Sequence, residues 1–164
     1  MRGNARLVFT ILLVLTAMSI FATSDALPQT VASHFGSNNL ANGWMSRDGY
    51  VLFMLCFSLG VPLFVVLTVG WLPRVAPRLV NLPNRDYWLS GERRDEALDY
   101  LLEHAYRLGS IVLLFMLGIH LLVLDANMAR PPRLAGGLLI LLMVLLFAAL
   151  GLWTVALMRR FRKP

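Results

Sequence analysis

Four stretches of the chain lack Asp, Glu, Lys and Arg and are long enough to cross a membrane as helices: residues 7–24, 50–72, 108–124 and 134–158. A helix of about 20 apolar residues spans the hydrocarbon core of a bilayer. Because lipid offers no hydrogen bonds to an open backbone, such segments become helices. The sequence therefore predicts an all-α integral membrane protein, with residues 1–164 forming a single membrane domain.

The composition supports this class. Hydrophobic residues make up 58% of the chain and charged residues only 15%, and the mean hydropathy of +0.68 exceeds that of ordinary soluble domains. The net charge of +6 does not indicate nucleic-acid binding, because no basic module with interleaved aromatic residues is present. The expected partner of the apolar surface is the lipid bilayer.

The basic residues predict the orientation of the four helices. Cytoplasmic segments of membrane proteins carry an excess of Lys and Arg. If both termini are cytoplasmic, 12 of the 15 basic residues lie inside, and only Arg47, Arg130 and Arg133 lie outside. We therefore expect an N-in, C-in multi-pass protein of the bacterial inner (cytoplasmic) membrane.

The first span has an alternative interpretation as a cleaved signal peptide. Arg2 and Arg6 precede an apolar stretch, and Ser24-Asp25-Ala26 has the form of a cleavage site. We favour a retained helix, because the apolar run is longer than a usual signal sequence. Its removal would also leave three spans, with the termini on opposite sides.

Two long loops connect the spans on opposite sides of the membrane. The outward loop, residues 25–49, contains the turn signals Asn38-Asn39 and Asn42-Gly43. The cytoplasmic loop, residues 73–107, begins with prolines that we expect to hold it extended. After Ser90, a predicted N-cap, apolar residues recur at helical spacing. We expect an amphipathic helix there that continues into the third span without interruption.

Acidic residues form a stripe on that amphipathic helix: Glu92, Glu96, Asp99 and Glu103 are four, three and four residues apart. One interpretation is a solvated face, partly balanced by neighbouring arginines. The other is a docking face for a basic cytoplasmic partner. Spacing alone leaves both open.

We expect no metal or cofactor site among the other polar residues, and for His34 a structural hydrogen-bonding role or ligand recognition. His34 has only Asp25 and Asp48 nearby in sequence, without the close spacing of a metal site. Cys56 has no partner cysteine, and we expect it to be a buried packing residue.

Two ionisable residues lie near the outer end of the third span. His120 and Asp125 are candidates for an intramembrane function, because ionisable groups are costly there. Five residues along a helix turn one away from the other by about 140°, so we expect them on different faces.

Catalytic motifs are missing from the sequence. It contains no HExxH, no GxSxG, no Walker lysine loop and no dinucleotide glycine fingerprint. We therefore expect a protein that is not an enzyme.

The outward loop resembles a known family. Leu27-Pro28, His34-Phe35-Gly36 and Asn42-Gly43-Trp44 are similar to the signature of the domain of unknown function 1648, found in SdpI-like bacterial membrane proteins. The similar region is residues 1–72, and Asn42 replaces an acidic residue of the pattern. The resemblance implies a multi-span inner-membrane protein whose outward loop recognises a ligand or has a structural role.

Three functions remain open at this point. The first is SdpI-like: sensing of, or immunity to, an extracytoplasmic peptide or envelope signal, with a protein partner at the cytoplasmic loop. The second is an accessory or structural subunit of a larger membrane complex. The third is a small transporter or ion pathway, for which the polar residues of the spans are sparse.

Overall fold

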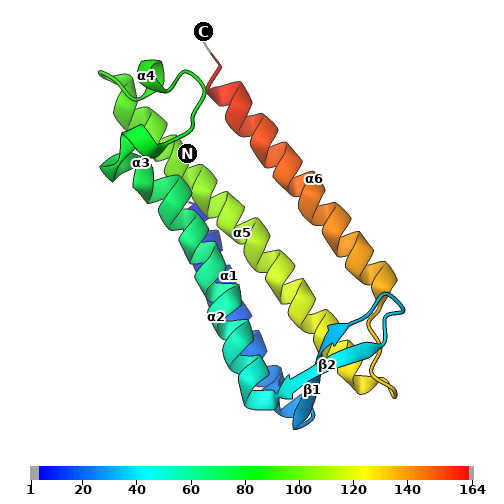
Figure 1. The fold of residues 1–164 in the computed structure, drawn as a ribbon. Helices are drawn as coiled ribbons and strands as arrows, with labels where there is room; N and C mark the ends of the chain where they lie inside the picture. Colours follow the sequence, from blue (N-terminus) through cyan, green and yellow to red (C-terminus); the bar gives the residue numbers. More distant parts are fainter. Residues whose placement is uncertain (1–3, 163–164) are drawn as a thin grey trace.

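Four long helices make up most of the computed structural model, which describes residues 4–162. They are α1 (Asn4–Thr23), α2 (Arg47–Val65), α5 (Arg93–Met128) and α6 (Gly136–Arg160). Each of the four, with its flanking turns, is long and apolar enough to cross a membrane. They run side by side in an elongated molecule (Figure 1). We call the end that carries the β-hairpin the hairpin end, and the opposite end, where α6 finishes, the loop end.

The predicted amphipathic helix and third span form one helix, α5, as expected. It begins at Arg93, with Glu92 in the N-cap position instead of Ser90. The reason is local: the Ser90 hydroxyl donates to Tyr87 O at 3.4 Å, and Gly91 takes a positive φ of 57° before the helix starts. α5 then continues for 36 residues from one end of the molecule to the other.

The interior of the bundle lies between α1, α2 and α5. At mid-height, Phe9 from α1 and Leu113 from α5 pack with Val66, which follows α2. Gly109 of α5 makes this close approach possible, because a Cβ there would lie 2.7 Å from Phe9 Cε2. α5 is thus the central helix of the fold.

α6 packs chiefly on α5 and has no buried residue along its length. At the loop end it is held by Trp153, whose Nε1 donates to His104 O at 2.9 Å. Phe161, just after α6, is fully buried with Leu98 and Leu101 of α5. The loop end of α6 is therefore fixed by specific contacts, and the rest of the helix is largely exposed.

The second span departs from α geometry one turn after Pro62. α2 is followed by a π-helical segment, η2 (Val66–Trp71), and by the short α3 (Leu72–Val75). Pro62 cannot donate a backbone hydrogen bond and crowds the preceding turn, which is a known cause of irregular helix geometry. Gly70 of η2 packs against α5, where a Cβ would lie 2.8 Å from Leu102 Cδ1.

The loop between the second and third spans is more helical than expected. After α3 it contains a 3-10 turn, η3 (Pro77–Leu79), and a short helix, α4 (Arg85–Trp88). The expectation that prolines hold this loop extended is wrong for Pro73 and Pro77. Both stand at the start of helical turns, a position where proline's fixed φ is favourable.

Two further expectations are corrected. The helical fold class is confirmed, but the loop between the first two spans contains strands: after the short 3-10 turn η1 (Ser24–Ala26) it forms an antiparallel hairpin of β1 (Thr30–Phe35) and β2 (Ala41–Ser46). Cys56 is exposed on α2 instead of buried. In a membrane helix an apolar residue is equally suited to lipid, so an apolar run does not reveal which side chains face inward.

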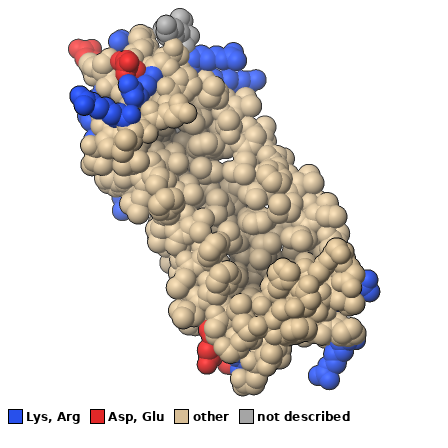
Figure 2. Space-filling view, viewed as in Figure 1, with Lys and Arg blue, Asp and Glu red and all other residues tan. Residues whose placement is uncertain are grey.

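Charged side chains gather at the two ends of the molecule, with an uncharged band between them (Figure 2). Most of the blue side chains lie at the loop end, and a smaller group lies beside the hairpin. This pattern is typical of a multi-pass membrane protein.

Candidate functional site

The turn that joins β1 to β2 is made by an asparagine in the left-handed region. Asn39 has a φ of 64°, which asparagine tolerates better than most residues. Its N–H donates to Gly36 O at 2.9 Å. The predicted turn at Asn38-Asn39 is therefore confirmed. The predicted turn at Asn42-Gly43 is wrong, since both residues lie inside β2.

Four of the signature residues form one polar patch on the hairpin. His34 Nδ1 lies 2.5 Å from Asn42 Oδ1, and since a carbonyl oxygen only accepts, Nδ1 donates. Gly43 lies opposite His34, and a Cβ there would lie 2.9 Å from His34 Cβ. A Cβ at Gly36 would lie 3.2 Å from Asn42 Nδ2. Both glycines thus make room for the histidine–asparagine pair, and both residues of the pair are exposed.

The remaining signature residues divide between the core and the surface. Leu27 is buried in the cluster that joins the hairpin to the helices, and Phe35 packs against that cluster. Pro28 is exposed. Trp44 of β2 is 55% exposed. His34 and Trp44 therefore present the accessible part of the site.

Asn127, near the end of α5, attaches the hairpin to the longest helix. Its Oδ1 accepts from Ala32 N at 2.8 Å, and its Nδ2 donates to Ala32 O at 3.0 Å. The same Nδ2 also donates to Val123 O at 2.8 Å, which fixes the side chain on its own helix. One amide side chain thus satisfies both backbone groups of a buried strand residue.

A second attachment joins the hairpin to the connection between α5 and α6. Leu40 and Arg133 form an isolated antiparallel bridge. Ala41 N donates to Pro132 O at 3.2 Å, and Leu134 N donates to Asn39 O at 2.9 Å. The start of β2 is therefore paired on both of its edges.

His120 lies fully buried below the hairpin, between three helices. Its Nε2 is 2.8 Å from Thr23 Oγ1 of α1, and its Nδ1 is 3.1 Å from Tyr50 Oη of α2. The imidazole also stacks on the Tyr50 ring, with 5.9 Å between centroids. Each ring nitrogen has a hydroxyl partner, so this cluster connects α1, α2 and α5 at one level.

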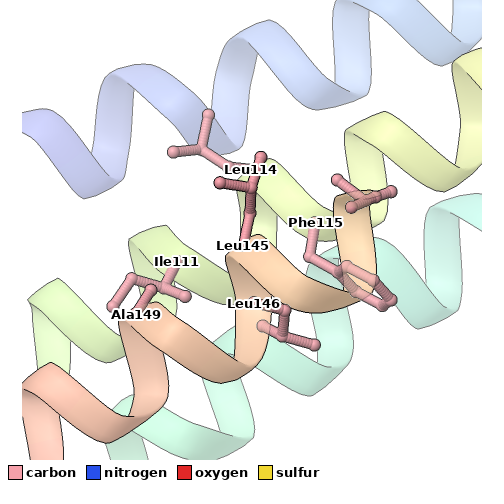
Figure 3. Close-up of a pocket in the computed structure, with 7 residues that line it drawn as sticks. Ile111, Leu114, Phe115, Leu145, Leu146 and Ala149 are labelled. Atoms are coloured by element: carbon pink, nitrogen blue, oxygen red, sulfur yellow. The ribbon is translucent and has the colours of Figure 1, made fainter. Parts of the chain in front are cut away.

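Asp125 lies on a different face of α5 from His120, as their spacing predicts. It is exposed and lines a cavity of about 370 Å³ between α5 and α6 that is otherwise almost entirely leucine. A second cavity of about 230 Å³ continues toward the loop end and shares Leu142 and Leu145 with the first. Figure 3 shows the apolar side chains of α5 and α6 that line this second cavity. The two cavities form an apolar groove along the helix pair.

The acidic stripe lies at the loop end of α5 and contacts arginines of the same chain. Glu96 Oε1 accepts from Arg160 at 2.6 Å, and Asp99 Oδ1 accepts from Arg74 at 2.7 Å. Glu103 lies 3.7 Å from Arg107 one turn later on the same helix. Glu92 is exposed just before the helix. The stripe thus connects α5 to α3 and α6, and its outer side remains accessible.

Aromatic side chains surround one of these arginines. The Arg160 guanidinium lies 4.6 Å from the centroid of Trp88 and 5.4 Å from that of Tyr100. Trp88 Nε1 donates to Phe161 O at 3.0 Å. The cluster holds the end of α6 against the loop and against the start of α5.

Among the described residues, the acidic and histidine side chains of the hairpin end do not gather into one cluster. Asp25 lies 3.7 Å from Arg47, so its nearest charged neighbour is a cation. Within residues 4–162 no group of three or more His, Cys, Asp or Glu side chains is placed to hold a metal ion. The exposed hairpin offers a ring nitrogen, an indole and strand backbone to a ligand.

Sequence reasoning missed three residues that organise the site: Asn127, Thr23 and Tyr50. Asn127 could have been noted as an amide near the end of an apolar helix, where an unpaired polar group is costly. Thr23 and Tyr50 are ordinary residues at span ends, and only the fold shows that they share His120.

Comparison with known proteins gives one family match. Neither the curated proteins nor the solved structures contain a match. Residues 11–59 match the family model described as Domain of unknown function (DUF1648). The matched range contains most of α1, the whole hairpin and more than half of α2. The expected resemblance to DUF1648 is confirmed for residues 11–59 of the expected 1–72: the chain is a membrane protein with four apolar helices and a DUF1648 region at residues 11–59.

Proposed function

We propose that this chain is a non-enzymatic bacterial inner-membrane protein that senses an extracytoplasmic peptide or envelope signal and responds at its cytoplasmic end. The hairpin is the sensing surface. The loop end, with the stripe of Glu92, Glu96, Asp99 and Glu103, is the responding surface. As in SdpI-like proteins, the response includes protection of the cell from the peptide. A soluble or membrane protein binds the loop end as the partner in this response.

One observation carries the proposal: α5 connects both surfaces as a single uninterrupted helix. At the hairpin end Asn127 holds Ala32 through two hydrogen bonds. At the loop end Glu96 and Asp99 of the same helix hold arginines of α6 and α3. A displacement of the hairpin therefore acts directly on the helix that positions the loop end.

The charges support the orientation. Of the 15 basic residues, 12 belong to the termini and to the loop that joins the second and third spans. This excess favours the loop end as the cytoplasmic side. The hairpin then faces outward, where an extracytoplasmic ligand would reach His34 and Trp44.

The family match supports the hairpin as the functional element. Residues 11–59 include both strands, most of α1 before them and the first part of α2 after them. The matched region thus leaves out the loop end, α5 and α6. This division fits a shared sensing module joined to a response element that differs between proteins.

A second candidate function, an accessory subunit of a larger complex, is supported by α6. No residue of α6 is buried, and an apolar groove runs between it and α5. Helices of a partner protein would cover this face. In that case the hairpin stabilises the assembly instead of sensing a ligand.

A crosslinking experiment separates the two functions. A photo-crosslinking residue in place of Ser90, which is exposed at the loop end, reports which proteins contact that end in native membranes. The chain is purified through a carboxy-terminal tag, and the crosslinked proteins are quantified by mass spectrometry. The variants are the double substitution His34→Ala, Trp44→Ala and, as a matched control, Ser37→Ala in the exposed turn.

Sensing predicts that the crosslinked proteins change with the double substitution and remain unchanged with Ser37→Ala. One large partner recovered in equal amounts from all three chains would favour the accessory subunit. The sensing function would be refuted if the crosslinks were unchanged and if cells that lack the protein were no more sensitive to toxic extracytoplasmic peptides than cells that contain it.

A further inference from the structure

The two outer edges of the hairpin differ in whether their backbone groups have hydrogen-bond partners. An antiparallel pair of strands has two outer edges, each with backbone groups that need partners. The edge of β1 is closed: Ala32 is buried, and the Asn127 side chain occupies both its N–H and its C=O. A further strand is therefore excluded from this edge at Ala32.

The edge of β2 is open at Trp44. Ala32 and Trp44 are opposite each other in the register. Because both backbone groups of Ala32 point away from β2, this is a pair without mutual hydrogen bonds. In such a pair the partner's groups point outward too, so the N–H and C=O of Trp44 face away from β1. Within residues 4–162 these groups have no hydrogen-bond partner outside the sheet.

The same edge already accepts a strand a few residues earlier. Ala41 N donates to Pro132 O, and the Leu40–Arg133 bridge is antiparallel. This pairing ends before Trp44, so the edge is available from Asn42 to Ser46. The register is irregular between Ala41 and Trp44, so this edge has two segments: one at Ala41 that the chain itself uses, and one centred on Trp44 that is unoccupied.

From this geometry we propose that the edge of β2, centred on Trp44, binds an extended peptide by strand addition. This inference rests on the proposed sensing function and specifies its mode of recognition. The peptide backbone exchanges hydrogen bonds with the N–H and C=O of Trp44. An aromatic or β-branched side chain of the peptide lies beside the exposed indole, since such neighbours on adjacent strands attract each other.

The dimensions of the edge favour a single extended segment over a second copy of this chain. The open part is bounded on one side by the 132–134 pairing and on the other by α2, which begins at Arg47. A peptide of about five residues, at about 3.3 Å per residue, fits between these limits. A second copy would bring its own connection and helix to the same narrow region.

The first test measures the edge itself. In the full-length chain in nanodiscs, hydrogen exchange of the Trp44 amide is compared with that of the Met45 amide. Met45 pairs with Val31 inside the hairpin, so its amide is protected and that of Trp44 exchanges quickly. Equal protection of both amides in nanodiscs that hold one copy would overturn the proposal. Protection of Trp44 that arises only when two copies share a nanodisc would assign the edge to a dimer and also overturn it.

The second test uses a defined probe, a fluorescein-labelled octapeptide of alternating threonine and valine, with empty nanodiscs as the control. Binding is followed by fluorescence anisotropy. Trp44→Pro removes the outward backbone N–H, a change that an edge strand tolerates. Trp44→Ala is the matched control, because it also removes the indole but keeps the N–H. We expect Trp44→Pro to bind about fivefold more weakly than Trp44→Ala, the effect of one backbone hydrogen bond.

A version of the probe with alternate amides N-methylated lacks the N–H groups that would bond to the strand edge, so it should not bind the unaltered chain. This comparison uses no variant and therefore remains valid even if Trp44→Pro unfolds the hairpin. Equal affinity for the plain and methylated probes would overturn the proposal.

The experiments distinguish a failure of strand addition from a failure of the proposed sensing function. If the crosslinks at position 90 respond to the double substitution His34→Ala, Trp44→Ala while the amide tests fail, sensing stands and strand addition falls. If the probe binds by its backbone and the crosslinks do not respond, strand addition stands without sensing.

Discussion

Replacing Asn127 with alanine should release the hairpin from α5 while leaving the helices assembled. The substitution removes both hydrogen bonds to Ala32, whose N–H and C=O are buried. A buried backbone group left without a partner costs about 1–3 kcal/mol. Asn127 itself is only partly buried, so water can replace some of the lost contact. We therefore expect the attachment of the hairpin to weaken by about 2–4 kcal/mol.

Hydrogen exchange of the Ala32 amide in nanodiscs measures this change. A loss of 2–4 kcal/mol corresponds to exchange that is faster by about thirtyfold to a thousandfold. Asn81→Ala is the matched control, because Asn81 is an exposed asparagine without a side-chain hydrogen bond among the described residues. Ala32 exchange that is equal in the Asn127→Ala chain and the unaltered chain would refute the attachment.

Two further substitutions, Gly109→Ala and Tyr50→Phe, test the interior by thermal unfolding, with Gly151→Ala as the control for the first. Gly109→Ala should lower the free energy of unfolding by about 1–3 kcal/mol through overpacking, since its Cβ would lie 2.7 Å from Phe9 Cε2. Gly151→Ala should be neutral or slightly stabilising, because nothing lies within 4 Å of its Cβ. Equal changes in the free energy of unfolding for Gly109→Ala and Gly151→Ala would contradict the close packing at Gly109. Tyr50→Phe should lower the free energy of unfolding by about 1–2 kcal/mol because it leaves His120 Nδ1 without its partner, and a chain as stable as the unaltered one would contradict that role.

The four helices were predictable from the sequence because each apolar run is long and free of charge. The continuity of α5 was predictable too, since no glycine or proline breaks the helical spacing between residue 93 and the third span. Which side of each helix faces inward was not predictable. Lipid and protein interior are both apolar, so the pattern did not distinguish exposed Cys56 from a buried residue.

The hairpin was missed for a different reason. Asn-Gly is a strong turn signal, so Asn42-Gly43 was interpreted as a turn. In the fold both residues lie within β2. Asn42 accepts a hydrogen bond from His34, and Gly43 leaves space for the His34 side chain. Those needs arise from a strand partner eight or nine residues away, which local sequence patterns do not specify.

The placement of the hairpin and the loop end on opposite sides of the membrane is tested most directly by cysteine labelling in intact cells. With Cys56→Ala as background, Ser37→Cys marks the hairpin turn and Ser90→Cys marks the loop end, both at exposed positions. A membrane-impermeant maleimide that reaches the periplasm should label position 37 without permeabilisation of the inner membrane and position 90 only after it. Labelling of both positions under the same condition, or in the reverse order, would contradict the outward hairpin and the sensing function built on it.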